Sequence, residues 1–361
     1  MPYEKRLEKA HQLLMEQDVE AVIVTSPANF FYFSGVWLDS YERLQAIVIS
    51  KDKEKSHMIV PEMSVEEVAS ATHFEKRFWK DGENPLEIVA NLLPDEGKVS
   101  IDNYWPSFQL LGLMDLKENL QYITSTSILG RLRLLKDEHE VQKLKESAKI
   151  ADEVVEEIID FVKPGMTEKE VVEEIVRLYQ AKGASDVSFG PIVAAGANGA
   201  VPHHSPGETI IKDGDMIVLD TGCIKDHYCS DTTRTFVVGE PTEEMKKVHK
   251  IVEEALEAAF KEVKPGVPLK KIDQTARDVI EKAGYGEYFT HRTGHGLGIQ
   301  VHEEPYVTNV NDQLLEEGMV FSIEPGIYLE GKFGVRIEDI VVVTSNGAKR
   351  LNHVDRHLIQ A

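Results

Sequence analysis

The chain is poor in cysteine and has no long apolar run. Its 361 residues include only two cysteines, Cys223 and Cys229. Two cysteines provide neither a disulfide framework nor a thiolate zinc site, so we expect two small buried side chains in a reducing cytoplasm. No stretch of ~18 apolar residues is present, which excludes a transmembrane helix. The first 17 residues predict a charged amphipathic helix and not a signal peptide. We therefore expect a cytoplasmic protein without a membrane partner.

Basic residues are also in the minority. Lysine and arginine number 40 against 62 aspartates and glutamates, which gives a formal net charge of −22. This surplus of negative charge argues against nucleic acid or an acidic membrane face as a partner. Residues 1 to about 125 have neither a GxGxxG nor a GxxxxGK[ST] segment, so no nucleotide site is expected there.

Alternating strand and helix patterns predict a small α/β domain over residues 1–125. A polar turn at 51–55 suggests that the second and third strands form a hairpin. A linker would cover 126–136, and a second domain would cover 137–361. The expected strands are 21–24, 44–50, 57–61, 98–102 and 120–124, and the expected helices are 62–71, 85–93 and 107–116.

The second domain repeats itself. A long amphipathic helix begins near Asp137 and ends at the KPG of residues 163–165, because proline cannot continue a helix. Its last part, EVVEEIIDFVKPG, matches EALEAAFKEVKPG at an offset of 101 residues. Matching helices and strand pairs follow in both copies, such as DGDMIVLDTG and EEGMVFSIEPG. Two copies of this length predict pseudo-symmetric halves that close on one centre.

Four acids lie in or beside the apolar strands of these repeats. They are Asp220, Asp231, Glu324 and Glu338. Burying ionised carboxylates is costly unless something pairs with them, and a pair of divalent metal ions is the simplest shared partner. Each acid also has an ordinary interpretation, as a turn former or as an ion pair with Arg234 or Arg336. Their matched placement in both repeats favours the metal interpretation.

Histidines supply a possible nitrogen ligand. His295 lies between glycines in HRTGHGLG, where the backbone can bend closely around it. His302 follows seven residues later, and His203 lies in AVPHHSP. Oxygen ligands with one imidazole suit Mn²⁺, Co²⁺, Fe²⁺ or Zn²⁺.

These motifs, taken in order, carry a family resemblance. DTG with a second aspartate 11 residues after the first, then GHGLG, EPG and RIED, resembles the signature of the pita-bread metallopeptidases of the creatinase/aminopeptidase superfamily. The segments NFFYFSG, LDSYER and VPEMSVEEV extend the resemblance to the bacterial Xaa-Pro dipeptidase (prolidase) branch. The resemblance implies a creatinase-like N-terminal α/β domain and an α+β pita-bread catalytic domain with a pseudo-twofold repeat.

The resemblance also implies roles for individual residues. Asp220 would chelate one metal, Asp231 and Glu338 would bridge two, and His295 and Glu324 would hold the second. Mn²⁺ or Co²⁺ would be the metals, with Zn²⁺ or Fe²⁺ as alternatives, and a metal-activated hydroxide would attack the peptide carbonyl. Glu324 would be the general base. His203 and His302 would bind the peptide and stabilise its oxyanion, and His291 would line the pocket. Arg336 would support Glu338 or the nearby acids.

A dipeptidase must recognise proline and the carboxylate that follows it. Prolyl nitrogen carries no N–H, so an apolar wall is expected, with Ile192, Phe189 and Tyr328 as candidates. Some archaeal-type prolidases place an arginine where this chain has Tyr306. Here the resemblance points instead to Arg292 in the HRTGHG segment and to Arg43 in an N-terminal loop, either of which could bind a carboxylate.

Other activities remain open at this point. An Xaa-Pro aminopeptidase would use the same metals on longer peptides, and a methionine aminopeptidase usually lacks so large an N-terminal domain. A non-catalytic binding module of the same fold is disfavoured because all five ligands are present. The resemblance also implies a homodimer in which the loop at 39–43 approaches the active site of a second copy.

Overall fold

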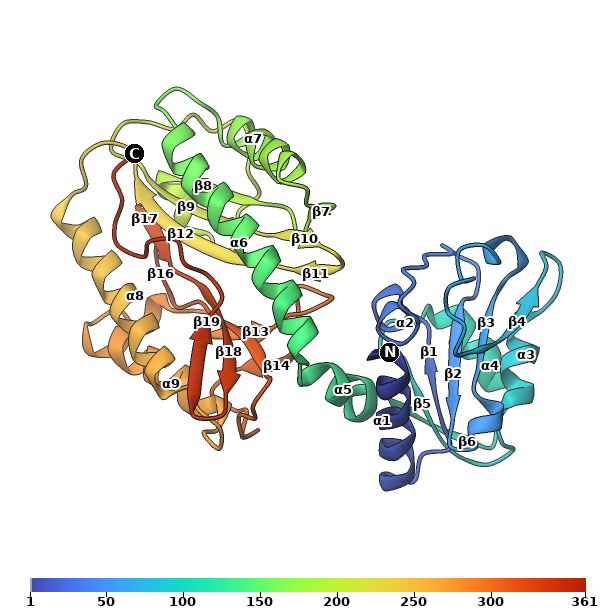
Figure 1. The fold of residues 1–361 in the computed structure, drawn as a ribbon. Coiled ribbons are helices and arrows are strands. Elements are labelled where there is room, and N and C mark those ends of the chain that lie inside the picture. Colours follow the sequence, from blue (N-terminus) through green and yellow to red (C-terminus); the bar gives the residue numbers. More distant parts are fainter. Residues whose placement is uncertain (1) are drawn as a thin grey trace. The chain divides into compact units, whose positions relative to one another are not determined.

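The computed structural model describes residues 2–361 (Figure 1). Its contacts divide the chain into two compact units, with the boundary between Arg133 and Leu134. Among the described residues, no helix has the length and apolar character that crossing a membrane requires.

The first unit contains one six-stranded sheet of order β4-β3-β2-β1-β5-β6. Strand β1 pairs antiparallel with β2 and parallel with β5, and β2 and β3 form the predicted antiparallel hairpin. Strands β1, β2 and β3 are fully buried and mostly aliphatic, so this sheet is the core of the unit. Its elements are α1 (Pro2–Glu16), β1 (Ala21–Val24), α2 (Pro27–Ser34), β2 (Ala46–Ser50), β3 (His57–Pro61), β4 (Glu75–Trp79), α3 (Pro85–Leu92), β5 (Gly97–Ile101), α4 (Ser107–Leu116) and β6 (Leu120–Thr124).

The helix predicted over 62–71 is wrong. A 3₁₀ turn covers Glu62–Ser64 and further turns follow, held by bonds such as Val65 N–H to the carbonyl of Glu62. Val68 and Ala71 of this segment are buried, whereas Met63 and Val65 are exposed. Strand β4 and helix α2 were not predicted. Most of β4 is polar and not buried, and α2 lacks amphipathic periodicity because nearly all its residues are buried.

The helix predicted from Asp137 is confirmed. Asp137 caps α6 (Glu138–Phe161) in a reciprocal capping box with Glu140, and Val162 follows the helix before the KPG segment. The short helix α5 (Arg131–Leu134) precedes it. The first repeat continues with α7 (Glu168–Ala181), β7 (Asp186–Val187), β8 (Ile192–Ala195), β9 (Met216–Thr221), β10 (Cys223–Lys225), β11 (Tyr228–Cys229) and β12 (Thr232–Val237). Both cysteines are buried, as predicted.

The second repeat has a corresponding order of helices and strands. It contains α8 (Glu243–Glu262), α9 (Leu269–Lys282), β13 (Gly294–Gly296), β14 (Glu303–Val307), β15 (Val320–Ile323), β16 (Gly326–Leu329), β17 (Phe333–Arg336), β18 (Asp339–Thr344) and β19 (Gly347–Arg350). The antiparallel pair of β9 and β12 corresponds to that of β15 and β18. One chain therefore contains an α/β unit and a second unit built from two similar α+β halves, as predicted.

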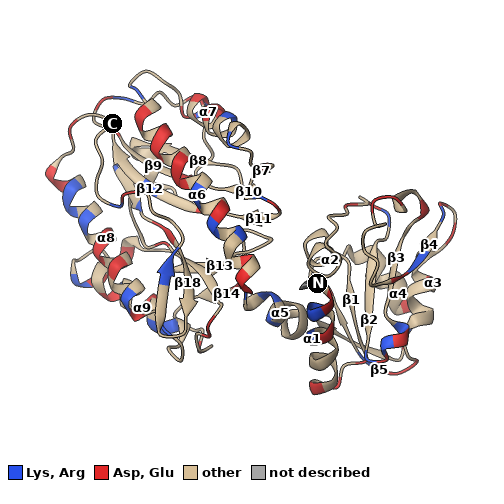
Figure 2. Cartoon of the chain, viewed as in Figure 1, with Lys and Arg blue, Asp and Glu red and all other residues tan. Residues whose placement is uncertain are grey.

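Each repeat has its own hydrophobic core between helices and strands. One core joins residues of α6 and α7 to β8, β9 and β12, and the other joins α8 and α9 to β15, β17 and β18. The helices lie outside the strands (Figure 1). Charged residues are concentrated on these helices, whereas β9 and β12 are mostly uncharged (Figure 2). An acid at a strand end in this interior therefore needs a specific partner.

Two glycines allow the turn at Gly196–Ala200 to pack against β17. A Cβ added to Gly334 would lie 1.8 Å from the carbonyl oxygen of Gly199.

We predict that Gly334→Ala lowers the free energy of unfolding by about 1–3 kcal/mol, because the backbone must move to relieve this overlap. Urea denaturation at equal metal content measures the change. The control is Gly347→Ala in β19, where no atom lies within 4 Å of the added Cβ and the change should stay within about 0.5 kcal/mol. Equal effects of the two substitutions would contradict the prediction.

Candidate metal centre and substrate cavity

The repeated strand pairs bring all four acids to one place. Asp220 lies in β9 opposite Thr233 of β12, and Asp231 immediately precedes β12. Glu324 follows β15, and Glu338 immediately precedes β18. The two halves join here, because the N–H of Glu338 donates to the carbonyl of Thr233 at 3.1 Å.

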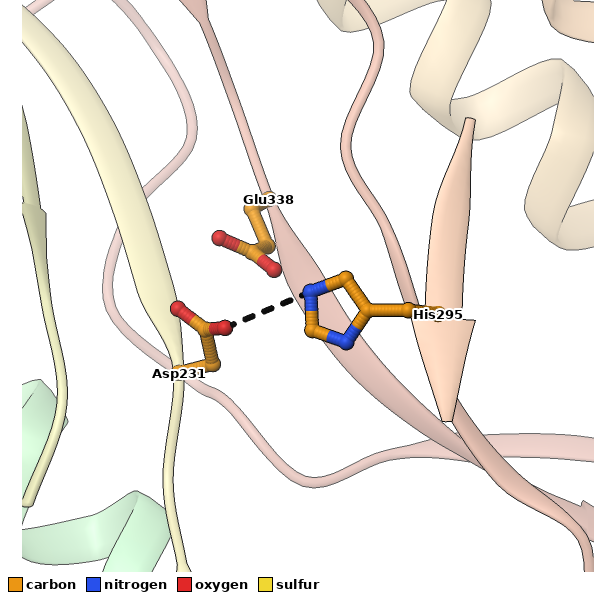
Figure 3. A group of neighbouring side chains, drawn as sticks. All are labelled: Asp231, His295 and Glu338. Atoms are coloured by element: carbon orange, nitrogen blue, oxygen red, sulfur yellow. Dashed lines mark ion pairs between the residues drawn. The ribbon is translucent and has the colours of Figure 1, made fainter. Parts of the chain in front are cut away.

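His295 completes a compact group with Asp231 and Glu338. One ligand atom from each residue lies within 4.8 Å of the others, and all three side chains are buried. The three side chains point toward one another from β13 and from the beginnings of β12 and β18 (Figure 3). His295 Nε2 lies 3.6 Å from Asp231 Oδ2 and 3.4 Å from Glu324 Oε1. Asp231, His295, Glu324 and Glu338, four of the five predicted ligands, thus lie close together.

Three oxygens of the four acids are buried without a hydrogen-bond partner. They are Asp220 Oδ1, Asp231 Oδ1 and Glu338 Oε1, and no donor within residues 2–361 reaches them. An unpaired buried oxygen of a charged group is among the costliest features a fold can contain. Divalent cations would satisfy these oxygens at once, and the mixture of carboxylate oxygens with one imidazole fits transition metals such as Mn²⁺, Co²⁺, Fe²⁺ or Zn²⁺. The residues present therefore fit metal binding.

Burial and mutual repulsion disfavour the ionised acids in the absence of cations. Burial, together with the charge of neighbouring acids, raises the pKa of Asp231 and of Glu338 well above the usual range. Burial raises the pKa of Glu324 to about 7. The same burial lowers the pKa of His295 to about 3, so its imidazole is neutral at neutral pH. Its Nδ1 contacts the carbonyl of Gly296 at 3.1 Å, which requires a proton on Nδ1 and leaves Nε2 as an electron-pair donor toward the acids.

A network of side chains holds the acids in place. Arg336 donates to Asp220 Oδ2 at 2.7 Å and to the hydroxyl of Tyr328 at 2.9 Å. Its Nε also donates to Thr233 Oγ1, which in turn donates to Glu338 Oε2 at 2.8 Å. Arg336 therefore supports one acid directly and Glu338 through Thr233.

The ordinary ion pairs considered for the acids do not form. Arg234 donates to Asp339 and to the backbone carbonyl of Glu338, not to Asp231. Arg336 binds Asp220 and makes no direct ion pair with Glu338 among the described residues. Neither basic residue satisfies the unpaired oxygens.

A cavity of about 640 Å³ opens over this group. All five predicted ligands line it, together with His203, His291, His302, Arg292 and Arg336. Phe189 and Ile192, two of the three residues considered for an apolar wall, also line it, as do Gly190, Pro202, His204 and Ser205. Tyr328 is buried beside the cavity and is not among the lining residues.

The cavity histidines differ in how they are held. His302 packs edge-on against His295, with 4.2 Å between the ring centroids. Nε2 of His291 lies 2.8 Å from the hydroxyl of Tyr328, and burial lowers the pKa of His291 to about 4. His203 is exposed on the cavity wall. The structure brings all three predicted histidines to one cavity.

The two predicted carboxylate-binding arginines lie in different units. Arg292 lines the cavity, and its guanidinium carbon lies 4.5 Å from the centre of the Tyr306 ring. Arg43 lies in the first unit, where its guanidinium binds Asp81 through two contacts of 2.9 Å and also Glu42. Within its own unit Arg43 is thus already paired with acids.

Two supporting residues were not identified from the sequence. Thr233 and Ser322 contact site residues, and Ser322 Oγ lies 3.2 Å from Glu324 Oε1. Tyr328 was expected only in an apolar wall, and its hydroxyl contacts His291 and Arg336 instead. Thr233 and Glu338 are 105 residues apart, so no local pattern links them. The repeat offered the only available signal, because it aligns the strands on which these residues lie.

Comparison with known proteins agrees with this geometry. Residues 142–345 match metallopeptidase family M24, and residues 6–135 match the creatinase/prolidase N-terminal domain. An uncharacterized peptidase of Staphylococcus aureus is 38% identical over 353 residues, which cover 97% of this chain and 99% of that protein.

Solved structures include similar proteins with named activities. A prolidase from Thermococcus sibiricus is 41% identical, with a TM-score of 0.95 and complete coverage of both chains. A dipeptidase from Pyrococcus horikoshii is 40% identical, with a TM-score of 0.93 and coverage of 99% and 100%. An X-Pro aminopeptidase from Thermotoga maritima is 32% identical, with a TM-score of 0.87 and coverage of 98% and 99%. With its cluster of buried acids, its duplicated second unit and these relatives, the chain belongs to metallopeptidase family M24.

Proposed function

We propose that this metallopeptidase hydrolyses Xaa-Pro dipeptides with two divalent ions, Mn²⁺ or Co²⁺, held by Asp220, Asp231, His295, Glu324 and Glu338. The observation that carries the proposal is the set of three buried carboxylate oxygens without hydrogen-bond partners at the floor of the cavity. Such a metal pair supplies an activated water and polarises the peptide carbonyl. The similarity to a prolidase at 41% identity supports the choice of substrate.

Glu324 is the proposed general base. Its carboxyl lies at the end of β15, with Oε1 near both His295 Nε2 and Ser322 Oγ. Burial raises the pKa of Glu324 to about 7 in the metal-free site, and a carboxylate held beside a bound water is a common general base. Glu324 would take a proton from the attacking water and deliver it to the departing prolyl nitrogen.

The cavity histidines would position the peptide. His203, His291 and His302 all line the cavity, and burial lowers the pKa of His291 and of His302. Neutral imidazoles donate hydrogen bonds without adding charge, and such donors stabilise the oxyanion that forms at the attacked carbonyl. Phe189 and Ile192 supply apolar surface in the same cavity, which suits a prolyl ring whose nitrogen has no hydrogen to donate.

A second candidate is an Xaa-Pro aminopeptidase, favoured by the likeness to the Thermotoga maritima enzyme. It would use the same ligands and would differ in accepting residues after proline. The position of Arg292 in the cavity favours the dipeptidase, because its guanidinium can bind a carboxylate that directly follows proline.

Product analysis tests the proposed activity. Protein loaded with Mn²⁺ or Co²⁺ should release leucine and proline from Leu-Pro and should leave Leu-Pro-Pro and a Met-initiated peptide largely intact. Chromatography of the products measures this, with chelated protein as the control. Efficient release of leucine from Leu-Pro-Pro would favour the aminopeptidase, and cleavage of only the Met-initiated peptide would favour a methionine aminopeptidase.

Removing one of the proposed bridging acids should abolish activity. We predict that Asp231→Ala and Glu338→Ala each lower kcat by at least about 10³-fold, because each side chain would serve both ions. Metal content of the purified and reloaded variants is measured alongside turnover. The control is Glu330→Ala, an exposed acid between β16 and β17. Near-normal turnover with two metals per chain in either bridging variant would refute the assignment.

Arg292 should distinguish a free carboxylate from an amide. We predict that Arg292→Ala lowers kcat/KM for Leu-Pro by about tenfold to hundredfold, as expected for loss of a charge-assisted hydrogen bond of ~1.5–3 kcal/mol. Leu-Pro-amide should be affected much less, because it has no negative charge to bind. Arg43→Ala should show the same selectivity more weakly, and the exposed Arg177→Ala serves as the control variant. Equal losses on acid and amide would show that neither arginine binds the carboxylate.

A further inference from the structure

One wall of the cavity is formed by a segment with little regular structure. Residues 196–207 connect β8 to the chain before β9, and a 3₁₀ turn at Gly196–Ala200 is its only helical part. Pro202, His203, His204 and Ser205 of this segment line the cavity. A segment without a strand partner needs other contacts to fix its conformation.

Glu168 provides those contacts from outside the cavity. It is the first residue of α7 and is fully buried. Its Oε1 accepts from Ala195 N at 2.9 Å and from Asn198 Nδ2 at 2.8 Å. Its Oε2 accepts from His204 Nε2 at 2.8 Å and from Gly207 N at 3.2 Å. One carboxylate thus binds the end of β8 at Ala195 and the segment itself at Asn198, His204 and Gly207.

The adjacent histidines have different environments. His204 is directed to Glu168 by its Nε2, and its backbone N–H donates to the carbonyl of Val201. His203 is exposed and makes no hydrogen bond within the described part of the chain. Arg336 adds a weaker contact to this segment, at 3.4 Å from the carbonyl of Pro202. His204 is therefore occupied with holding the segment, which leaves the imidazole of His203 free to meet a ligand.

We infer that Glu168 is a positioning residue that fixes His203 for the peptide by holding His204 and the backbone on both sides of it. The inference rests on the proposed function, in which His203 binds the substrate. Glu168 does not line the cavity, so its effect on the reaction passes entirely through this segment.

Glu168→Gln tests the contact with a minimal change in shape. Each oxygen of Glu168 accepts from one backbone N–H, of Ala195 or of Gly207. A carboxamide replaces one oxygen with a donor, so either orientation leaves one backbone N–H facing an N–H group. Hydrogen exchange in a peptide covering 195–207 should become about tenfold faster. This measurement requires no activity and can be made with or without metal.

A double-mutant cycle with His203→Ala separates positioning from general destabilisation. Glu168→Gln alone should lower kcat/KM for Leu-Pro about tenfold, at unchanged metal content. In the His203→Ala background it should cause less than about a twofold further loss, because the group that it positions is gone. If Glu168→Gln does not fold, His204→Ala removes only the central contact and should show the same coupling.

Asp102→Asn is the matched control. Asp102 is also a buried acid, and it accepts hydrogen bonds from Thr25 N, Ser26 N, Ser26 Oγ and Asn29 Nδ2 in the first unit. The fold-change in kcat/KM caused by Asp102→Asn should be the same in the wild-type and His203→Ala backgrounds. Hydrogen exchange over residues 195–207 should not change. Independent losses for Glu168→Gln and His203→Ala, or unchanged exchange over 195–207, would overturn the inference. Wild-type protein that fails to cleave Xaa-Pro peptides would instead refute the proposed function.

Discussion

The charge of four carboxylates in an apolar interior constrains the whole catalytic unit. Asp231 and Glu338 are almost fully buried, and Asp220 and Glu324 lie beside them. Without cations, protonation is the only relief, and burial accordingly raises the pKa of Asp231 and of Glu338 well above normal. With divalent ions the same crowding becomes favourable, because each oxygen that repels its neighbours gains a cation. Cation binding would thus relieve the crowding while the acids stay ionised, which supports the proposed metal site.

Holding the acids requires contacts that cross between the repeats. Arg336 of the second repeat binds Asp220 of the first, and Thr233 of the first donates to Glu338 of the second. The side chain of Arg234 bonds the backbone carbonyl of Glu338 and pairs with Asp339. Because each half supplies supports for the acids of the other, neither half could form this centre alone. The metal centre and the packing of the two halves are thus one structural feature.

The sequence was most informative where a pattern is local or repeated. The KPG segment ended α6, apolar runs marked β1, β2 and β3, and matched acids in the two repeats identified one centre. The sequence was least informative where long-range packing determines the local conformation or the partner of a side chain. The segment after β3 contains helix-forming residues and buries Val68 and Ala71, yet it folds as turns. The partners of Arg234 and Arg336 also depended on three-dimensional packing, since their sequence neighbours Asp231 and Glu338 were the obvious candidates and neither forms the pair.

The two halves correspond in their paired acids but differ in the loops that line the cavity. The repeat offset of 101 residues pairs Glu168 with Leu269, and both are fully buried at the beginning of a helix. In the second half the buried acid that holds a loop is Asp273, one helical turn after Leu269. Asp273 accepts a hydrogen bond from the N–H of Thr293 and pairs with Arg277. Arg277 in turn donates to the carbonyl of His291. Each half thus uses one buried acid to hold a loop that lines the cavity, but from different positions. A metal pair can be held by equivalent groups on both sides, whereas a peptide has two chemically different ends. Separate anchors allow the His203 segment and the His291–Arg292 segment to be shaped independently, as binding of an unsymmetrical substrate requires.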